Sequence, residues 1–313
     1  MACTCLSRNN KLSAGTPAPQ AKSQARKLRS AQLPAHNFRS WQNLRPAVRH
    51  LAALVRNSAT TNAPAMAKQQ QAFQPSKPTL FDVPVSNNGA RCRYVIYKKQ
   101  LEGEVDITSP QTLGGLKSEQ YLALNAQGKM PMLVLPDGTA LPESEVINQY
   151  LVEKYKDQGP SLIPATPELR AKAALLTRFL DLYINSVQGC MYKAMPAERR
   201  AAELAQINTQ LDILEGLASA PYIAGNEPST ADAALFPTFV FMTYMLPFAF
   251  GWDSVFKRRP KLQAWWNHIQ SDDAASRVIA EIREALDSWK AADRWVKQGI
   301  LEQVADKQHK WTF

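Results

Sequence analysis

Short apolar runs and helical repeats alternate between residues 79 and 155, and this pattern predicts a small α/β domain. Apolar runs of strand length occur at 79–82, 105–107, 132–135 and 140–141. Segments with apolar residues every three or four positions occur at 90–100, 118–124 and 145–155. The turn Pro136-Asp137-Gly138 joins the last two strands into a β-hairpin. The predicted order is therefore β-α-β-α-β-β-α.

From residue 158 onward, every periodic segment is helical. Glycine and prolines mark a linker over 158–168. Beyond it, apolar residues recur with helical spacing over 169–187 as one long helix, then over 204–214 and 262–289. The chain thus divides into a leader with linker at 1–77, the α/β domain at 78–157, a linker at 158–168, an all-helical domain at 169–288 and a charged helical tail at 289–313.

The stretch Ala233–Gly251 is the most apolar part of the chain and contains no charged residue. Its length could span a bilayer, so a transmembrane helix is one interpretation. However, Ser229 and Asp232 just before it fit a capping box, and two prolines, Pro237 and Pro247, interrupt it. These features favour a central core helix wrapped by amphipathic neighbours, with no membrane span.

Charge is distributed unevenly along the chain. There are 37 Lys and Arg against 27 Asp and Glu, a net charge of +10, yet residues 1–80 hold twelve of the basic residues and no acidic ones. The remainder carries 25 basic and 27 acidic residues, which excludes nucleic-acid binding as a leading function.

The acid-free leader has the composition of an organelle transit peptide. It is rich in Arg, Ser, Ala and Gln, contains an amphipathic patch at Arg45–Arg56, and lacks the continuous apolar stretch of a secretory signal. We expect chloroplast targeting, with the mitochondrion as the alternative. A basic tail retained for membrane or RNA contact is the other interpretation.

The four cysteines offer little redox or metal chemistry. Cys3 and Cys5 lie in the leader, whereas Cys92 and Cys190 lie far apart in helical segments. This spacing predicts no disulfide framework, no zinc site and no Cys-x-x-Cys redox pair. His268 stands beside two tryptophans without an evident partner, so we predict no metal site and no histidine-based triad.

Three separated pieces of the α/β domain carry the candidate chemistry. Ser86 lies between the first strand and the first helix, Met130-Pro131 precedes the third strand, and Glu143-Ser144 opens the last helix. A proline just before a strand suits a cis bond that presents the Met130 backbone to a peptide-like ligand. The helix start at Ser144 offers free N–H groups and partial positive charge to a carboxylate. These last two features predict a peptide clamp.

These pieces, in this order, resemble the soluble glutathione transferases. The matching segments are Ser86 followed by Arg91 and Arg93, Asn125-x-x-Gly128-Lys129-Met130-Pro131, Glu143-Ser144-x-x-Ile147, and Tyr222-Ile223-Ala224-Gly225-x-x-Pro228-Ser229-x-Ala231-Asp232. Four ordered motifs over roughly residues 79–288 are more specific than any one of them. The resemblance implies a thioredoxin-like α/β N-terminal domain followed by an all-α helical C-terminal domain.

The resemblance also implies a site for glutathione as co-substrate. The residues implied to bind it are Lys129, Met130, Pro131, Glu143 and Ser144. Met130 would pair with the glutathione backbone, and Lys129 would contact the glycyl carboxylate. Glu143 and Ser144 would hold the γ-glutamyl end. Ser86 is implied to be catalytic, because a serine at its position activates the glutathione sulfur.

The serine also limits the expected reaction. Family members that work by thiol exchange, such as dehydroascorbate reductases, have cysteine at the position of Ser86, so that activity is not expected. Serine is typical of plant-type and zeta-like classes, but Asn87-Asn88-Gly89 lacks the Ser-Cys of zeta isomerases. We therefore predict a glutathione S-transferase that conjugates small-molecule electrophiles, in detoxification or stress response.

Two alternatives stay open at the level of sequence: a zeta-like glutathione-dependent isomerase, and a non-catalytic protein that uses the same fold to carry ligands. Taken alone, Ser86 could simply cap the helix that follows it.

Candidate residues for the electrophile lie near the end of the first long helix. They are Tyr183, Cys190, Met191 and Tyr192, which could line an acceptor pocket at the cleft between the domains. For Cys190 and Met191, core packing is the alternative interpretation. Family members are commonly dimers, so the resemblance also implies a homodimer.

Overall fold

The structure is a computed structural model, and it describes residues 73–313. These residues belong to one compact unit that runs from Gln70 to Phe313. Apart from its last five positions, the predicted leader and linker at 1–77 lies outside the described residues, as do Cys3 and Cys5.

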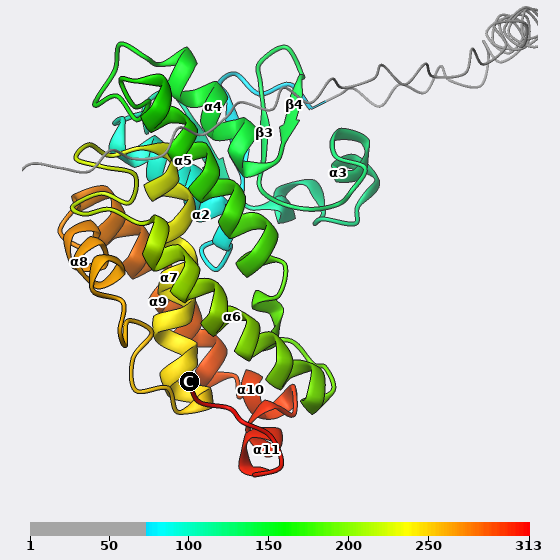
Figure 1. Cartoon of the computed structure of the whole chain (residues 1–313). Coiled ribbons are helices and arrows are strands. Elements are labelled where there is room, and N and C mark those ends of the chain that lie inside the picture. The colour runs from blue at the N-terminus through cyan, green and yellow to red at the C-terminus, as the bar shows by residue number, and fades with distance from the viewer. Residues whose placement is uncertain (1–72) are drawn as a thin grey trace, which may run out of the picture. The chain divides into compact units, whose positions relative to one another are not determined.

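A four-stranded sheet organises the α/β part of the chain (Figure 1). Its strands are β1 Thr79–Phe81, β2 Asp106–Thr108, β3 Met132–Val134 and β4 Ala140–Pro142, in the order β2-β1-β3-β4. β1 pairs with β2 in parallel and with β3 antiparallel, and β3 and β4 form the predicted hairpin. The register places Phe81 opposite Met132, and Met132 opposite Pro142. The chain therefore leaves β1, enters β3 and leaves β4 at the same edge of the sheet.

Helices cover both faces of this sheet. They are α2 Asn87–Lys98, the 3₁₀ helix η3 Pro110–Leu113, α3 Glu119–Leu124 and α4 Ser144–Lys154. Because strand side chains alternate, Leu80 and Leu133 join the main core with α2 and α4, whereas Phe81 and Met132 pack in a second cluster with Tyr121 of α3. The predicted β-α-β-α-β-β-α order is confirmed.

The remainder of the described chain is helical. Its α-helices are α5 Pro167–Phe179, α6 Ala197–Leu217, α7 Thr230–Phe250, α8 Pro260–Ile269, α9 Asp273–Ala291, α10 Arg294–Lys297 and α11 Ile300–Ala305. The long helix predicted over 169–187 runs without a break from Pro167 to Asn185, but its last six residues form a π-helix, η4 Leu180–Asn185, and a separate 3₁₀ helix, η5 Gln188–Met191, follows. A π-helical turn contains one residue more than an α-helical turn, so the residues after it face a different side of the helix. Apolar spacing of three and four residues does not reveal this change.

Helix α7 is the core helix that the apolar stretch predicted, and it lies between α5 and α9 (Figure 1). By length and composition alone it could cross a membrane, but 78% of its apolar window is buried inside the protein. The capping box at its start is formed. The Asp232 carboxylate accepts hydrogen bonds from the N–H groups of Ser229 and Ile223, each at 2.8 Å, and from the Trp265 indole at 2.9 Å. Burial raises the pKa of this carboxyl group, and these hydrogen bonds oppose the rise.

The tail after α9 packs against the helical domain and differs from the predicted charged helix. It forms only the short helices α10 and α11, and the chain beyond Asp306 is not helical. The Trp295 indole donates to the Met191 carbonyl at 2.9 Å, and the Trp252 indole donates to the Trp311 carbonyl at 2.8 Å. The tail is therefore held against the helical domain by its buried residues Trp295 and Trp311.

Candidate functional site

Ser86 lies in the loop that leaves β1, and it is the N-cap of α2. Its Oγ accepts a hydrogen bond from the Gly89 N–H at 3.0 Å, which satisfies one of the open donors of the first turn. The residue is 8% exposed. Because the serine oxygen is the acceptor in this bond, its hydroxyl proton stays available for donation. The capping role expected as an alternative is therefore present, and it does not consume the hydroxyl proton.

The segment before β3 has the predicted cis peptide bond, between Met130 and Pro131. The Lys129 carbonyl is fixed by two donors, the Tyr121 hydroxyl at 2.8 Å and the Asn125 side-chain amide at 2.9 Å. Pro131 is buried, Met130 is half-buried and Lys129 is exposed. The backbone of this segment is thus held in place while the Lys129 side chain faces solvent.

Glu143 and Ser144 form the start of α4, as predicted. Glu143 has a φ of +72°, a conformation that non-glycine residues rarely adopt. Its side chain makes no capping hydrogen bond to the helix, so the first-turn N–H groups of α4 lack a side-chain acceptor at the N-cap. Ser144 is 7% exposed and Glu143 is exposed. Open N–H groups at a helix start favour a bound carboxylate.

The sheet register brings these three pieces together. Phe81, Met132 and Pro142 share a row, and the loop to Ser86, the Met130-Pro131 bond and the start of α4 all lie just beyond that row. The second turn of α2 also contacts the start of α4, because the Cys92 Sγ lies 3.7 Å from the Ser144 carbonyl oxygen. The Ser86 hydroxyl, the backbone at Met130-Pro131 and the N-terminus of α4 therefore all lie at the same edge of the sheet.

A buried ion pair lies beneath the Ser86 loop. The Asp82 carboxylate, directly after β1, is 3.0 Å from the Arg93 Nε, and both side chains are almost fully buried. Arg93 also pairs with Glu281 of α9, and it donates to the Pro84 carbonyl at 2.7 Å. Burial raises the pKa of Asp82 to about 7, opposed chiefly by the Arg93 charge. Sequence analysis missed Asp82, although a polar residue directly after a buried strand was a usable signal.

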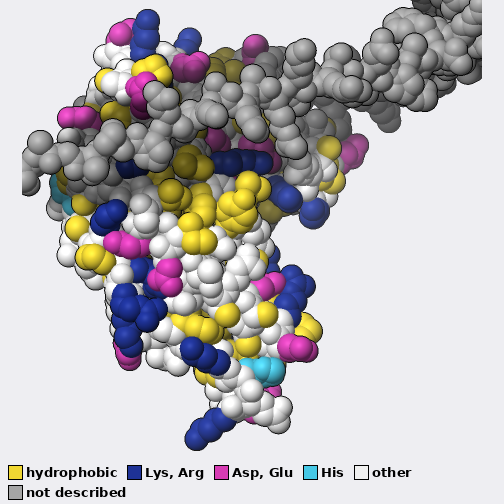
Figure 2. Space-filling view, viewed as in Figure 1, with side chains coloured by type: hydrophobic (Ala, Val, Ile, Leu, Met, Phe, Trp, Pro, Cys, Tyr) yellow, Lys and Arg dark blue, Asp and Glu magenta, His cyan; other side chains and the backbone are white. Residues whose placement is uncertain are grey.

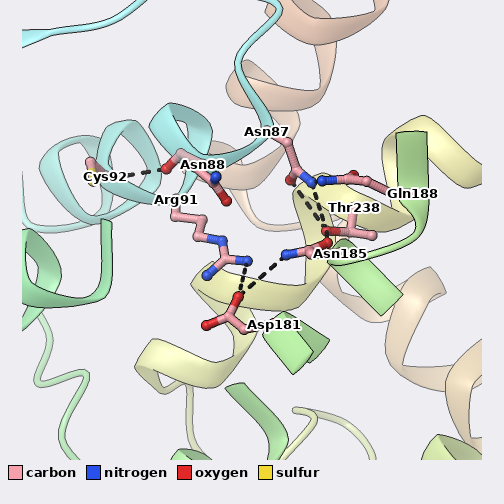
Figure 3. A network of polar contacts seen from close by, with 8 residues as sticks. All are labelled: Asn87, Asn88, Arg91, Cys92, Asp181, Asn185, Gln188 and Thr238. Carbon is pink, nitrogen blue, oxygen red and sulfur yellow. Dashed lines mark hydrogen bonds and ion pairs between the residues drawn. The ribbon is translucent and has the colours of Figure 1, made fainter. Parts of the chain in front are cut away.

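A network of polar side chains joins the first turn of α2 to the helical domain (Figure 3). The Asn87 amide donates to Gln188 at 2.8 Å and to the Thr238 hydroxyl at 2.9 Å. Farther along α2, Arg91 pairs with Asp181 of the π-helix at 2.7 Å. The residue next to Ser86 is therefore bonded to both η5 and α7. These contacts depend on the π-helix and were not predictable from helical spacing.

The four candidate acceptor residues have different environments. Cys190 and Met191 have no exposed surface, and burial raises the pKa of the Cys190 thiol to about 12. Tyr192 is half-buried, with its ring near Trp289. Tyr183 is 46% exposed and its ring packs on Phe179 instead.

A cavity of about 270 Å³ lies beside the Ser86 loop, between that loop and α9. Its lining residues are Pro84, Glu281, Glu284, Ala285 and Ser288. Sequence analysis did not select any of them, because their spacing is that of an ordinary solvated helix face. Among residues 73–313, no group of three or more His, Cys, Asp or Glu side chains could hold a metal ion.

Two family models match this chain. The family model of the glutathione S-transferase N-terminal domain matches residues 80–160, and that of the C-terminal domain matches residues 197–267. Glutathione S-transferase 3 of Zea mays is 32% identical over 222 residues, which cover 65% of this chain and 93% of the maize protein. The chain belongs to the glutathione S-transferase family. Glutathione S-transferase F10 of Arabidopsis thaliana is 30% identical over 54% of this transferase and 81% of its own length.

Solved structures of the family have the same fold. Glutathione S-transferase III in its apo form is 26% identical, with a TM-score of 0.54 over 66% of this chain and 97% of its own. Rice GST1 in complex with glutathione is 24% identical, with a TM-score of 0.58 over 69% of this chain and 96% of its own. The expected fold, a thioredoxin-like domain followed by a helical domain, is confirmed.

Proposed function

We propose that this glutathione transferase activates the glutathione thiol at Ser86 for attack on small-molecule electrophiles. The observation that carries the proposal is the strand register. Phe81, Met132 and Pro142 lie side by side on neighbouring strands, so the Ser86 loop, the Met130-Pro131 segment and the start of α4 lie at one edge of the sheet. A thiol-containing peptide bound along that edge can contact the Ser86 hydroxyl, the Met130 backbone and the N-terminus of α4 at the same time.

Each part of glutathione has a partner in this arrangement. The γ-glutamyl carboxylate binds the open N–H groups at Glu143-Ser144, where the helix dipole favours negative charge. The Met130 backbone before the cis bond pairs with the cysteinyl peptide group. The exposed Lys129 side chain is available to the glycyl carboxylate.

The hydroxyl of Ser86 supplies the chemistry. A thiol with a pKa of about 8.5 is only ~3% ionised at pH 7. A donated hydrogen bond that lowers the thiol pKa by ~2 units corresponds to about 2.7 kcal/mol and makes the thiolate the main form. The thiolate then attacks the electrophile, which we place in the cavity between Pro84 and α9.

Turnover of the full-length chain against a panel of electrophiles, with and without glutathione, tests this function. We expect conjugation that requires glutathione. Glutathione binding without turnover of any electrophile would favour the ligand-carrier alternative. Isomerisation of an unsaturated substrate with glutathione released unchanged would favour the zeta-like alternative.

We propose further that the transferase is a homodimer formed through α4 and α5. Three apolar side chains are about half exposed there: Val146 at 47%, Leu175 at 52% and Leu182 in the adjoining π-helix at 45%. Figure 2 shows hydrophobic side chains gathered over α5. Light scattering should give twice the chain mass, and Leu175→Glu should give monomer. Ile213→Glu, at an equally exposed position on α6, is the control that should leave the dimer intact.

We also propose that the leader directs the chain to the chloroplast. Support comes from its twelve basic and no acidic residues within 1–80. A reporter fused to residues 1–75 should be imported into plastids. Import into mitochondria would favour the alternative destination, and cytosolic retention would remove the targeting proposal.

A further inference from the structure

The first turn of α2 begins directly after Ser86 and is bonded to side chains of the helical domain (Figure 3). Asn87 is the first residue of this helix and is buried. Its side-chain amide donates to the Gln188 Oε1 of η5 at 2.8 Å and to the Thr238 hydroxyl of α7 at 2.9 Å. These partners lie 101 and 151 positions farther along the chain. The residue next to Ser86 is therefore fixed by two distant segments.

The hydrogen bonds continue beyond Thr238 in one direction. The Thr238 hydroxyl accepts from Asn87 and has one proton to donate, and the Asn185 Oδ1 at 3.0 Å is a nearer acceptor than the Asn87 Oδ1 at 3.2 Å. The Asn185 amide donates to the Asp181 carboxylate at 3.3 Å. Arg91, one turn farther along α2, pairs with the same carboxylate oxygen at 2.7 Å. The chain of bonds therefore starts and ends on α2.

The position of this helix turn decides where the Ser86 hydroxyl lies. Ser86 is covalently joined to Asn87, and its Oγ accepts from the Gly89 N–H of the same turn. Thr238 has no exposed surface, so it cannot contact a ligand at the sheet edge itself. Any effect of the Thr238 hydroxyl on bound glutathione must therefore pass through the helix turn that carries Ser86.

We propose that Asn87, Thr238 and Gln188 are positioning residues, which hold the first turn of α2 so that the Ser86 hydroxyl points at the glutathione sulfur. This inference rests on the proposed function of Ser86. The network fixes a position and transfers no proton. A misplacement of about 1 Å at a reacting group can cost on the order of a hundredfold in rate. The helical domain thereby contributes to thiol activation through residues that do not contact the sulfur.

The first test is Thr238→Val in the full-length chain, which removes the hydroxyl and keeps a side chain of similar size. Turnover near neutral pH should fall roughly tenfold, whereas glutathione affinity measured by calorimetry should change little. The pKa of the bound thiol, followed by the ultraviolet absorbance of the thiolate, should rise by roughly one unit, because one unit corresponds to a tenfold loss of thiolate stabilisation. A loss of folding stability alone would not move this titration.

Two further variants separate the hydrogen bond from the packing. Thr177→Val is the matched control, because Thr177 of α5 is 3% exposed and its hydroxyl has no hydrogen-bond partner among residues 73–313. It should leave turnover and the thiol pKa unchanged. Thr238→Ser keeps the hydroxyl and should restore most of the wild-type turnover and thiol pKa. A Thr238→Ser protein as impaired as Thr238→Val would overturn the inference.

A double-mutant cycle shows whether Thr238 acts through Ser86. A Ser86→Ala background has no hydroxyl to misplace, so Thr238→Val should cause no further rise in the thiol pKa there. A rise of equal size in both backgrounds would contradict the proposed positioning role. So would an unchanged thiol pKa in Thr238→Val alone.

Gln188→Leu keeps the inference testable if Thr238→Val does not fold. It removes the other partner of the Asn87 amide, at a half-buried position of η5, and should also raise the thiol pKa. An unchanged thiol pKa in this variant would overturn the inference. If Ser86→Ala itself leaves the thiol pKa and the turnover at neutral pH unchanged, the proposed function fails, which is a separate outcome.

Discussion

Replacing Ser86 by alanine removes two hydrogen bonds that have separate consequences. The bond accepted from Gly89 at 3.0 Å caps α2, and losing such a cap costs about 0.5–2 kcal/mol of folding stability. The bond donated to a bound thiolate exists only when the sulfur is charged. Its loss removes roughly 1.4–4 kcal/mol of anion stabilisation, which corresponds to a ten- to thousandfold fall in turnover.

The assay is conjugation of an electrophile near neutral pH, with glutathione affinity measured by calorimetry. Affinity should change little, since the thiol itself gains little from the hydroxyl. The loss of turnover should shrink as pH rises, because bulk solvent then ionises the bound thiol.

Thr166→Ala is the matched control for the cap. Thr166 accepts from the Leu169 N–H at 3.3 Å at the start of α5, so this variant loses a comparable bond without touching the thiol site. It should lower the melting temperature and keep full turnover. Full turnover of Ser86→Ala at neutral pH would refute the role of Ser86, and a deficit that is the same at every pH would refute the thiolate argument.

Three further predictions follow from the same site. Ser144→Ala should weaken glutathione binding by about 1–3 kcal/mol, the worth of a hydrogen bond to a charged group, and unchanged affinity by calorimetry would contradict the γ-glutamyl assignment. Ser86→Cys should form a mixed disulfide with glutathione, visible as added mass, and gain thiol exchange while losing conjugation. Asp82 has a folded pKa near 7 against 3.8 ordinarily, so the folded state binds more protons and stability falls as pH rises from about 4 to 7. Asp82→Asn should flatten that part of the melting curve against pH, and an unaltered slope would count against the assignment.

The sequence predicted the order of elements well because each strand and helix carries its own local signal. The Met130-Pro131 bond, the start of α4 and the Asp232 capping box are also local features, and a few neighbouring residues suffice to predict each of them. The row Phe81, Met132 and Pro142 is a product of strand pairing, so only the structure shows that these motifs share an edge.

Other parts of the site depend on contacts between distant segments. Arg93 belongs to a motif that the sequence shows, but its ion-pair partners do not. They are Asp82, directly after β1, and Glu281 of α9, which lie nearly two hundred positions apart in the sequence. The polar residues of α9 have the spacing of an ordinary solvent-exposed helix face, so nothing in the sequence marks Glu281 as the partner of a buried arginine. The burial of Cys190 likewise depends on packing around α6, where Arg200 bonds to its carbonyl.

Because Leu180–Asn185 form a π-helix, the number of residues in this segment decides which of its side chains reach their partners, just as the residue types do. Deleting one residue within it would allow regular α-helical geometry, which turns every later residue by about 100° relative to those before it. Asp181 could then keep Arg91, or Asn185 could keep Thr238, but not both. Relatives that differ by a single residue here would therefore lose either the Arg91–Asp181 contact between the two domains or the Asn185–Thr238 contact inside the helical domain, even where the sequence on either side is unchanged.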